Sequence, residues 1–333
     1  MSASPPDLMH AALRGDAGLA FASIPRPVPG PDDVLVRVRA VALNRADLGV
    51  LAGHMHGNIG GTGTVLGMEW AGEVVRIGSG VDGRALGERV MGFGAGAFAE
   101  YAIADRGRVL PVPAGMTFEQ AATLPVALMT MHDALVTNGR LERGQAVLIQ
   151  GASSGVGLMA LQIARHLGAS LVVGSSSDAG RRARLHEFGA GLSIDTSDPD
   201  WPGIVRNATG GQGVDLVIDQ LSGATTNATM AATKVRGRIV NVGRLAGTRG
   251  EFDFDLHALR RIDYVGVTFR TRSLDEVREI GRRMWADLAP AVADGSLALP
   301  VSATFPFERL GEAFEMMRAN RHFGKIVAVL DPA

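Results

Sequence analysis

The stretch VLIQGASSGVGLMALQIARHLGA, residues 147–169, contains the clearest structural signal of the 333-residue chain. A hydrophobic strand runs into a glycine-rich turn, which opens a helix whose apolar residues recur at three- and four-residue spacing. Gly151, Gly155 and Gly157 have no Cβ, so backbone N–H groups and the helix N-terminus can approach a pyrophosphate. We therefore predict a nucleotide site in this turn, which Ser154 and Val156 complete.

Strands and helices alternate on both sides of this turn. We predict strands at 146–150, 171–174, 192–194, 214–219, 238–242 and 264–269, helices at 156–167, 181–188 and 225–232, and a further segment at 201–208. Alternation at this spacing is typical of a doubly wound parallel sheet, which binds its ligand at the carboxyl ends of the strands.

The remaining parts of the chain have a different pattern. Residues 9–110 are strand-like and rich in glycine and proline, with clear alternation at 35–41. After residue 269 we predict a helix at 274–293, a strand at 301–305, a helix at 307–318 and a strand at 326–330. We expect this tail to rejoin the first domain. The predicted domains are 1–125, a β-rich catalytic part; 126–265, the nucleotide-binding domain; and 266–333, the return to the catalytic part.

The composition excludes several classes of function. The net charge is −1 with 20% charged residues, and no basic run stands out, so nucleic acid is not an expected partner. The absence of cysteine excludes disulfides, thiolate metal sites and a thiol nucleophile. The sequence shows no signal peptide and nothing that approaches a membrane span, so we expect a cytoplasmic protein that acts on a small molecule.

The end of the second predicted strand indicates which dinucleotide binds. An NAD enzyme would have Asp or Glu there, about 20 residues past the turn, to hold the ribose 2′-hydroxyl. This chain has Ser175, Ser176 and Ser177, followed by Arg181 and Arg182. A guanidinium suits a 2′-phosphate, so we predict NADPH. The alternative is that both arginines are ordinary solvated helix residues.

Several motifs of the chain resemble those of the medium-chain dehydrogenase/reductase superfamily, and within it the zinc-free, zeta-crystallin-like NADPH:quinone oxidoreductases. The resemblance covers nearly the whole chain and implies a Rossmann domain inserted between two parts of a β-rich, GroES-like catalytic domain. The motifs are Asn44-Arg45-Ala46-Asp47, Gly67–Val74, Gly87–Val90, Ala97–Tyr101, Thr130, the glycine turn and Gly324-Lys325-Ile326-Val327.

The departures from the superfamily concern zinc. Its zinc alcohol dehydrogenases would have cysteine where Asn44 stands, histidine where Met68 stands and a further cysteine near Val126. Zinc needs about four N, S or O donors in a tetrahedral arrangement, and an amide beside a thioether cannot replace a thiolate and an imidazole. We therefore predict a zinc-independent enzyme with no metal site.

The resemblance also implies roles for single residues. Asn44 and Asp47 are expected to line the substrate end of the site as catalytic residues, although Asp47 is equally explained as an acid that caps or braces its loop. Relatives often have a tyrosine close to this motif. Here Gly49 stands at one such position, which leaves His54, His56 and His132 as the groups that titrate near neutral pH.

The cofactor contacts beyond the turn are expected as follows. The Thr130 hydroxyl, at the start of a helix that joins the two domains, is expected to reach the nicotinamide ribose, although a threonine there can also be only a cap or a packed residue. Lys325 is included with the cofactor-binding residues. The ends of two strands should face the nicotinamide, at Val242 and Gly243 and at Thr268 and Phe269.

Together these features predict a reductase that transfers a hydride from NADPH to a quinone or a similar conjugated carbonyl. Two alternatives stay open: an NADPH-dependent enoyl or enone reductase, and an NADPH-binding protein with little turnover. We also expect a homodimer or homotetramer, because the strand at 264–269 would be an edge strand able to pair across a two-fold axis.

Overall fold

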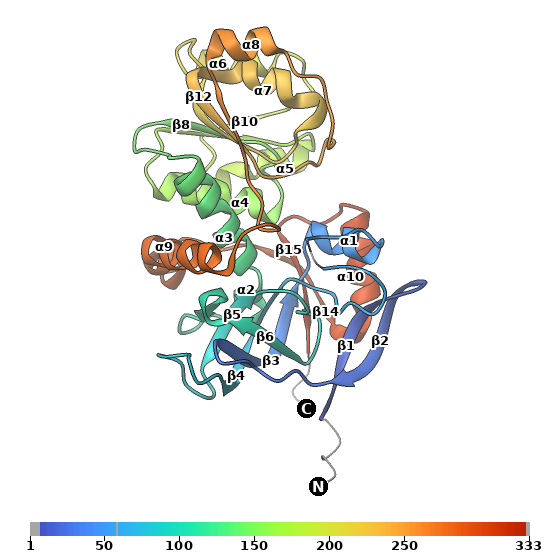
Figure 1. Cartoon of the computed structure of the whole chain (residues 1–333). Helices are drawn as coiled ribbons and strands as arrows, with labels where there is room; N and C mark the ends of the chain where they lie inside the picture. The colour runs from blue at the N-terminus through green and yellow to red at the C-terminus, as the bar shows by residue number, and fades with distance from the viewer. Residues whose placement is uncertain (1–6, 58, 331–333) are drawn as a thin grey trace. The chain divides into compact units, whose positions relative to one another are not determined.

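The computed structural model describes residues 7–57 and 59–330, and the chain divides into two compact units. Unit 1 contains residues 1–126 and 270–333, and unit 2 contains residues 127–269. In Figure 1 the blue strands of the N-terminal part and the red strands β14 and β15 therefore belong to the same unit. Among the described residues, no helix combines the length and the apolar character needed to cross a membrane.

Unit 2 is built on a six-stranded sheet in which every pairing is parallel. The strand order β10-β9-β8-β11-β12-β13 reverses direction between β8 and β11, which is where such sheets bind their ligands. This confirms the predicted doubly wound sheet. The strands are β8 (Ala146–Ile149), β9 (Leu171–Ser175), β10 (Leu192–Ile194), β11 (Val214–Asp219), β12 (Thr233–Asn241) and β13 (Asp263–Gly266).

One helix, α3, precedes this sheet, and short helices connect its strands. Buried apolar side chains of the first helix after β8, including Leu158, Met159 and Ile163, explain its amphipathic pattern. The helices are α3 (Pro125–His132), which continues into a π-helical turn (Asp133–Asn138), α4 (Gly155–His166), α5 (Ala179–Ala183), α6 (Trp201–Ala208), α7 (Thr226–Ala232) and α8 (Phe254–Arg260).

Three predicted elements of unit 2 need correction. The predicted helix 181–188 is two pieces, α5 and a 3₁₀ turn at Leu185–Phe188, because Leu185 is the only fully buried side chain there and Gly189 ends the segment at φ 100°. The predicted helix 225–232 begins with a 3₁₀ turn at Gly223–Thr225. The predicted strand 264–269 ends at Gly266, so Thr268 and Phe269 lie beyond it.

Unit 1 joins the N-terminal part of the chain to its C-terminal part in one seven-stranded sheet. β15 lies between β14 and β3 and pairs antiparallel with β3, so the tail rejoins the first part as predicted. The strands are β3 (Asp33–Ala42), β4 (Glu69–Ile77), β5 (Arg89–Phe93), β6 (Tyr101–Asp105), β7 (Val109–Pro111), β14 (Val301–Pro306) and β15 (Lys325–Val329).

Unit 1 also contains a hairpin and four helices. A separate antiparallel hairpin, β1 (Leu8–Gly15) and β2 (Gly18–Pro25), belongs to the same unit. The helices of unit 1 are α1 (Arg45–Leu51), α2 (Phe118–Ala122), α9 (Leu274–Ala293) and α10 (Leu310–Arg318), the last preceded by a 3₁₀ turn at Phe307–Arg309.

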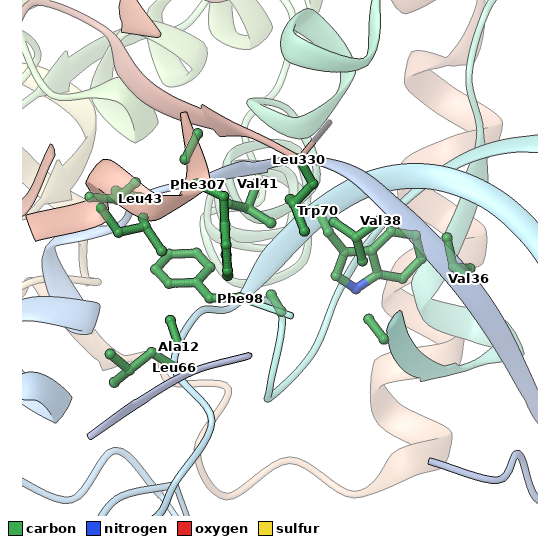
Figure 2. Close-up of a cluster of buried hydrophobic side chains, with 14 of the residues drawn as sticks. Ala12, Val36, Val38, Val41, Leu43, Leu66, Trp70, Phe98, Phe307 and Leu330 are labelled. Carbon is green, nitrogen blue, oxygen red and sulfur yellow. The ribbon is translucent and has the colours of Figure 1, made fainter. Parts of the chain in front are cut away.

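The core of unit 1 combines side chains from both parts of the chain. Figure 2 shows Trp70 and Phe98 from the N-terminal part and Phe307 and Leu330 from the C-terminal part in one buried cluster. Gly67 has φ 90°, and a Cβ there would overlap the ring of Phe98. This glycine of the Gly67–Val74 motif is therefore required by packing of the core.

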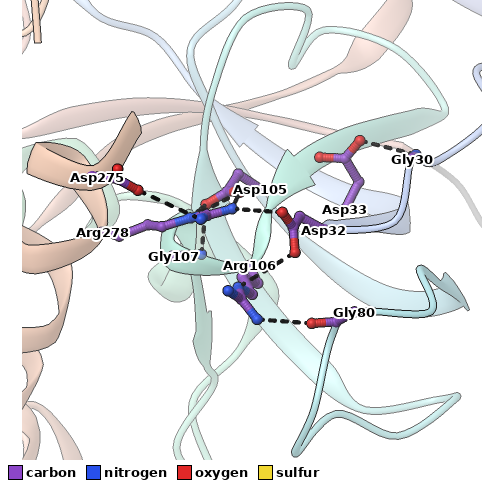
Figure 3. Close-up of polar contacts among 9 residues, drawn as sticks. All are labelled: Gly30, Asp32, Asp33, Gly80, Asp105, Arg106, Gly107, Asp275 and Arg278. Atoms are coloured by element: carbon purple, nitrogen blue, oxygen red, sulfur yellow. Dashed lines mark hydrogen bonds and ion pairs between the residues drawn. The ribbon is translucent and has the colours of Figure 1, made fainter. Parts of the chain in front are cut away.

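An ion-pair network fixes α9 to the N-terminal strands. The Arg278 guanidinium lies 2.6 Å from Asp105 at the end of β6 and 3.1 Å from Asp32 just before β3 (Figure 3). Burial opposes ionisation of Asp105, but hydrogen bonds from Arg278 and from the Gly107 N–H outweigh it, so the pKa of Asp105 lies below its ordinary value.

Candidate functional site

The glycine turn lies between β8 and α4, at the point where the strand order reverses. Gly151 has φ 66°, and its N–H donates to Ser175 Oγ at the end of β9 (3.1 Å). A Cβ on Gly157 would lie 2.5 Å from the Gly151 carbonyl oxygen and 2.7 Å from Ala152 Cα. Only glycine at 157 lets the helix start this close to the turn.

Ser154 is the N-cap of α4. Its hydroxyl accepts from the Gly157 N–H (3.1 Å) and lies 2.9 Å from Gly151 O and 3.1 Å from Gln220 Oε1. A hydroxyl has one proton, and both of these acceptors are within the protein. The Ser154 hydroxyl therefore caps α4 and is engaged by groups of the turn and of the loop after β11.

The turn nevertheless suits a dinucleotide. Gly155 and Val156, the first two residues of α4, are half-exposed, and N–H groups in the first turn of a helix have no acceptor within the helix. Two such N–H groups at the positive end of a twelve-residue helix form the expected environment for a pyrophosphate.

The end of β9 is also a compact polar site. Ser175 is fully buried, and Ser176 Oγ lies 3.1 Å from Ser153 Oγ of the glycine turn. Arg182 donates to the Ser176 carbonyl (2.8 Å) and pairs with Asp195 (2.9 Å), so it braces this segment. Asp178 caps α5 by accepting from the Arg181 N–H (2.8 Å).

Three other predicted cofactor contacts have positions that differ from expectation. Thr130 lies in the second half of α3 and not at its start, because the helix begins at Pro125, a residue that fits the first helical position. Val242 and Gly243 are the first residues after β12, and both N–H groups donate to the Asp219 carbonyl, at 2.8 and 3.1 Å.

The sequence reasoning missed a polar network at the carboxyl ends of β11 and β12. Its members are buried: Asp219 and Asn241 end β11 and β12, and Gln220 and Ser222 lie in the loop after β11. Gln220 connects this network to the glycine turn through Ser154. Burial raises the pKa of Asp219, and N–H donors from Ser222 and Leu221 oppose this rise. The sequence signal that could have predicted this network is the polar pair Asp219-Gln220 at the end of a hydrophobic strand.

Unit 1 contains a second buried polar cluster, which brings together Asn44, Asp47, Glu69 and Lys325. Lys325 Nζ contacts Glu69 Oε1 in an ion pair and donates to Asn44 Oδ1 (2.9 Å). Asn44 Nδ2 donates to Glu69 Oε1 (2.9 Å), and Asp47 Oδ2 accepts from the Asn44 backbone N–H (2.7 Å). Two predicted catalytic residues and Lys325 thus meet around Glu69, to which the sequence assigned no role.

Burial dominates the protonation of this cluster. It raises the pKa of Asp47 from 3.8 to about 7, against the opposing effects of the Asn44 N–H and the Lys325 ammonium. Burial also raises the pKa of Glu69, and Lys325 opposes this. The second oxygen of Asp47, Oδ1, is buried without a hydrogen-bond partner in the part of the chain that the structure describes. Asp47 is therefore the carboxyl group of this cluster that exchanges a proton near neutral pH.

This donor set does not fit zinc. Both polar atoms of the Asn44 side chain are engaged, and Val126 contributes only a backbone N–H, which donates to Glu69 Oε2 (3.0 Å). The ammonium of Lys325 would repel a cation placed beside Glu69. Across residues 7–57 and 59–330, no three His, Cys, Asp or Glu side chains are grouped so that they could hold a metal ion.

The three candidate histidines, His54, His56 and His132, have different environments. His132 is fully buried in unit 2, and His54 is exposed in unit 1. His56 is half-buried, and burial together with the positive charge of Arg270 lowers its pKa. At neutral pH His56 is therefore a neutral imidazole.

Two family models match the chain. The model of the alcohol dehydrogenase GroES-like domain matches residues 30–114, and the model of zinc-binding dehydrogenases matches residues 155–286. The first lies within the N-terminal part of unit 1, and the second begins at the first residue of α4.

Among curated proteins, the chain is similar to one of the phenolphthiocerol/phthiocerol polyketide synthase subunits of Mycobacterium tuberculosis, with 32% identity over 91% of this chain. The chain spans only 14% of that protein. It is also similar to the synaptic vesicle membrane protein VAT-1 homolog of Rattus norvegicus, with 31% identity over 92% of this chain and 79% of the relative.

Solved structures show the same fold over almost the whole chain. A mycobacterial quinone oxidoreductase has 27% identity and a TM-score of 0.85 over 96% of this chain and 99% of its own. Mycobacterial Rv1454c, solved in complex with NADPH, has 26% identity and a TM-score of 0.85 with the same coverage. The CurK enoyl reductase has 25% identity and a TM-score of 0.86 over 98% of this chain and 100% of its own.

Proposed function

The chain belongs to the medium-chain dehydrogenase/reductase superfamily and is an NAD(P)-dependent oxidoreductase, and on this basis we propose that it reduces a quinone or a similar conjugated carbonyl with NADPH. The observation that carries the proposal is the contact of Lys325 with Asn44 and Glu69. The ammonium of Lys325 lies beside the side chain of Asn44, one of the positions where zinc-dependent relatives would need a metal ligand.

NADPH supplies the hydride when it is bound. The first-turn N–H groups of α4 would hold its pyrophosphate, and Ser176 with Arg181 would hold the 2′-phosphate. Ser175 is fully buried and supports the glycine turn through the Gly151 N–H. Rv1454c, a structural relative, binds NADPH. No acidic side chain occupies the end of β9 to select the 2′-hydroxyl of NADH, since Ser175 ends that strand.

A quinone suits the residues that are present. Hydride addition to a quinone gives an aromatic hydroquinone anion, which water protonates, so the protein needs to supply neither a metal nor a strong acid. The chain's task is then to bind and orient the acceptor and to exclude water. Lys325 would neutralise the charge of Glu69 in the buried cluster, and Asn44 would fix the position of the Glu69 side chain through its hydrogen bond.

An enoyl or enone reductase is the second candidate, and Asp47 favours it. Reduction of a conjugated C=C bond places a hydride on one carbon and requires a proton on the other. Asp47 has a pKa of about 7 and an unpartnered, buried Oδ1, so it can hold a proton near neutral pH. The similarity to part of a polyketide synthase and to the CurK enoyl reductase supports the same candidate.

A panel of acceptors tests the proposal. The full chain is mixed anaerobically with NADPH or NADH and with para-benzoquinone, phenanthrenequinone, an α,β-unsaturated ketone or a crotonyl thioester, and loss of the reduced nicotinamide absorbance is followed. The proposal expects NADPH-dependent turnover of the quinones. Turnover of the enone or thioester alone would establish the second candidate, and cofactor binding without turnover of any acceptor would contradict both.

Asp47→Asn separates the two candidates further. Quinone reduction should keep its rate, because water protonates the product, whereas enone reduction should slow at least about tenfold if Asp47 holds the required proton. Asp33→Asn is the matched control, since Asp33 accepts a backbone N–H, from Gly30 (3.0 Å), in the same unit but outside the buried cluster. It should change neither activity.

We also propose that the chain assembles through β13, the outermost strand of the sheet of unit 2. Its free edge can accept the same strand of a second copy across a two-fold axis. Sedimentation as a monomer at micromolar concentration would contradict this.

A further inference from the structure

Ser222 has a backbone conformation that is essentially reserved for glycine. It lies directly before the 3₁₀ turn Gly223–Thr225, in the loop after β11, and has φ 58° and ψ −155°. Non-glycine residues persist in this region only where the surrounding structure holds them there, and they gather at functional sites. The contacts of Ser222 therefore indicate which part of the site its backbone conformation serves.

Hydrogen bonds hold Ser222 from two sides. Asp219 Oδ1 accepts from the backbone N–H groups of Leu221 (2.9 Å) and Ser222 (3.0 Å). The Ser222 hydroxyl donates to the Gly243 carbonyl (2.7 Å) and accepts from Asn241 Nδ2. Both hydrogen-bonding functions of the hydroxyl are thus used to connect the loop after β11 to the residues that follow β12.

The two loops are joined tightly along their length. Backbone N–H groups of Leu245 and Ala246 donate to the carbonyls of Gln220 (3.0 Å) and Leu221 (2.9 Å). A Cβ on Gly243 would lie 2.6 Å from the Gln220 carbonyl oxygen, so there is no room for a side chain. Ser222 lies in the middle of this contact and fixes the direction of the Gly243 carbonyl.

The contact between these two loops lies at the carboxyl ends of the strands, where a doubly wound sheet binds its cofactor. Both loops leave the carboxyl ends of parallel strands, and Gln220 contacts Ser154 of the glycine turn. Val242 and Gly243 are the predicted backbone contacts of the nicotinamide half. The N–H groups of Val242 and Gly243 and the Gly243 carbonyl are held by Asp219 and Ser222, so the peptide would offer the cofactor a surface of fixed shape without first losing conformational freedom, which favours binding.

We propose that Ser222 is a positioning residue for the nicotinamide half of the dinucleotide and acts through Gly243. The inference rests on the proposed function, because it requires that NADPH binds in unit 2. Its energetic effect is expected on the nicotinamide end alone, since the pyrophosphate and 2′-phosphate groups have their own contacts at α4 and β9.

The experiment compares two ligands by titration calorimetry of the full chain. NADPH contains both halves of the dinucleotide, whereas adenosine 2′,5′-bisphosphate lacks the nicotinamide half. Ser222→Ala should weaken NADPH binding about tenfold, the equivalent of one lost interaction. Binding of adenosine 2′,5′-bisphosphate should change less than about twofold. The Michaelis constant for NADPH should rise more than the turnover number falls.

Two further variants separate positioning from stability. Thr233→Val removes a comparable buried hydroxyl, which donates to the Thr229 carbonyl (2.7 Å) at the amino end of β12, the opposite edge of the sheet. It should lower the melting temperature and leave both affinities unchanged. Ser222→Gly removes the hydroxyl but relieves the backbone, so it should melt above Ser222→Ala and still lose NADPH affinity selectively.

The outcomes are distinguishable. Equal weakening of both ligands in Ser222→Ala and Ser222→Gly, or no weakening of either, would show that Ser222 is a structural residue only. A wild-type chain that binds neither NADPH nor adenosine 2′,5′-bisphosphate would instead overturn the proposed function, and with it this inference.

Discussion

Lys325 and Glu69 form a buried ion pair although 256 residues separate them in the chain. Each is the first residue of its strand, β15 and β4, and their side chains are 5% and 0% exposed. Burying two charges costs free energy that is offset only when their remaining hydrogen-bonding groups are also satisfied. Asn44 and the Val126 N–H do this here, so the pair connects the C-terminal part of unit 1 to its N-terminal part.

Lys325→Met should destabilise unit 1 strongly. The substitution leaves the Glu69 carboxylate buried without its cation, which costs about 3–5 kcal/mol in the free energy of unfolding. Urea denaturation followed by tryptophan fluorescence measures the change in a background with Trp201→Phe and Trp285→Phe, which leaves Trp70 in the core of this unit as the reporter. The double variant Glu69→Gln with Lys325→Met should recover most of the loss, because no unpaired charge remains.

A half-exposed lysine provides the control for this prediction. Lys234 pairs with Asp215 at 2.8 Å, but its side chain is 41% exposed. Lys234→Met should therefore cost less than about 1 kcal/mol. Equal losses for Lys234→Met and Lys325→Met would show that the pair with Glu69 contributes no more than a surface ion pair.

Asp47 should make the stability of unit 1 fall as the pH rises. Its pKa is raised to about 7 in the folded chain, whereas in the unfolded chain a carboxyl group has its ordinary value of about 3.9. Between these two values the folded state binds a proton that the unfolded state has lost. The contribution of Asp47 is thus most favourable below about pH 4, decreases up to about pH 7 and is constant above it, a total change on the order of 4 kcal/mol.

The comparison with Asp47→Asn isolates this effect from the other carboxyl groups. The free energy of unfolding of both chains is measured from pH 4 to pH 8. Wild type should be the more stable at pH 4, and its advantage should shrink or reverse by pH 8. A constant difference over this range would mean that Asp47 ionises in the folded chain as it does in the unfolded one.

The sequence predicted the parts of the structure that depend on local pattern. The helix at 274–293 agrees residue for residue with α9, where Ser273 and Glu276 form a capping box and Val277, Ile280 and Met284 are buried. The parallel sheet followed from strand and helix alternation in the same way. The predicted ends of helices and strands were less accurate where tertiary contacts determine them, as at Leu185–Phe188 and after Gly266.

The residues that were missed depend on distant contacts. Glu69 was part of a recognised motif, but its partner Lys325 joins it only when β15 pairs with β3, and no local pattern indicates this. Likewise, the sequence around Ser222 does not predict its positive φ, because the neighbouring Gly223 is the residue expected to adopt such a conformation. The structure therefore adds the hydrogen bonds and ion pairs that buried polar groups make with residues distant in the chain.

Gly157→Ala should impair both the fold of unit 2 and cofactor binding. The new methyl group would lie 2.5 Å from the Gly151 carbonyl oxygen, so α4 must move away from the turn, at a cost of about 1–3 kcal/mol. The affinity for NADPH should fall because the N–H groups of Gly155 and Val156 move with the helix. Thermal denaturation and calorimetric titration measure the two effects.

Gly180→Ala is the matched control in the same unit. Gly180 lies in α5, and the nearest atom to a new Cβ there is the Asp178 carboxyl oxygen at 3.4 Å, an ordinary contact. Alanine favours a helix over glycine by about 1 kcal/mol, so this variant should be as stable as wild type or slightly more stable. Similar losses in both variants would show that the close approach at Gly157 has no special importance.

Arg181→Ala should change which cofactor the enzyme prefers. If the Arg181 guanidinium binds the 2′-phosphate, kcat/KM for NADPH should fall at least about tenfold while kcat/KM for NADH stays the same, because NADH has no phosphate at that position. Arg184→Ala removes an equal charge one turn further on, where the side chain pairs with Glu187 at 3.0 Å, and should alter neither value. Arg182→Ala is expected to lower both, because Arg182 holds the Ser176 carbonyl and Asp195 and thereby the loop that both cofactors contact. A parallel decrease for NADPH and NADH in Arg181→Ala would place Arg181 in the same supporting role as Arg182 and would leave NADPH selectivity to the serines at the end of β9.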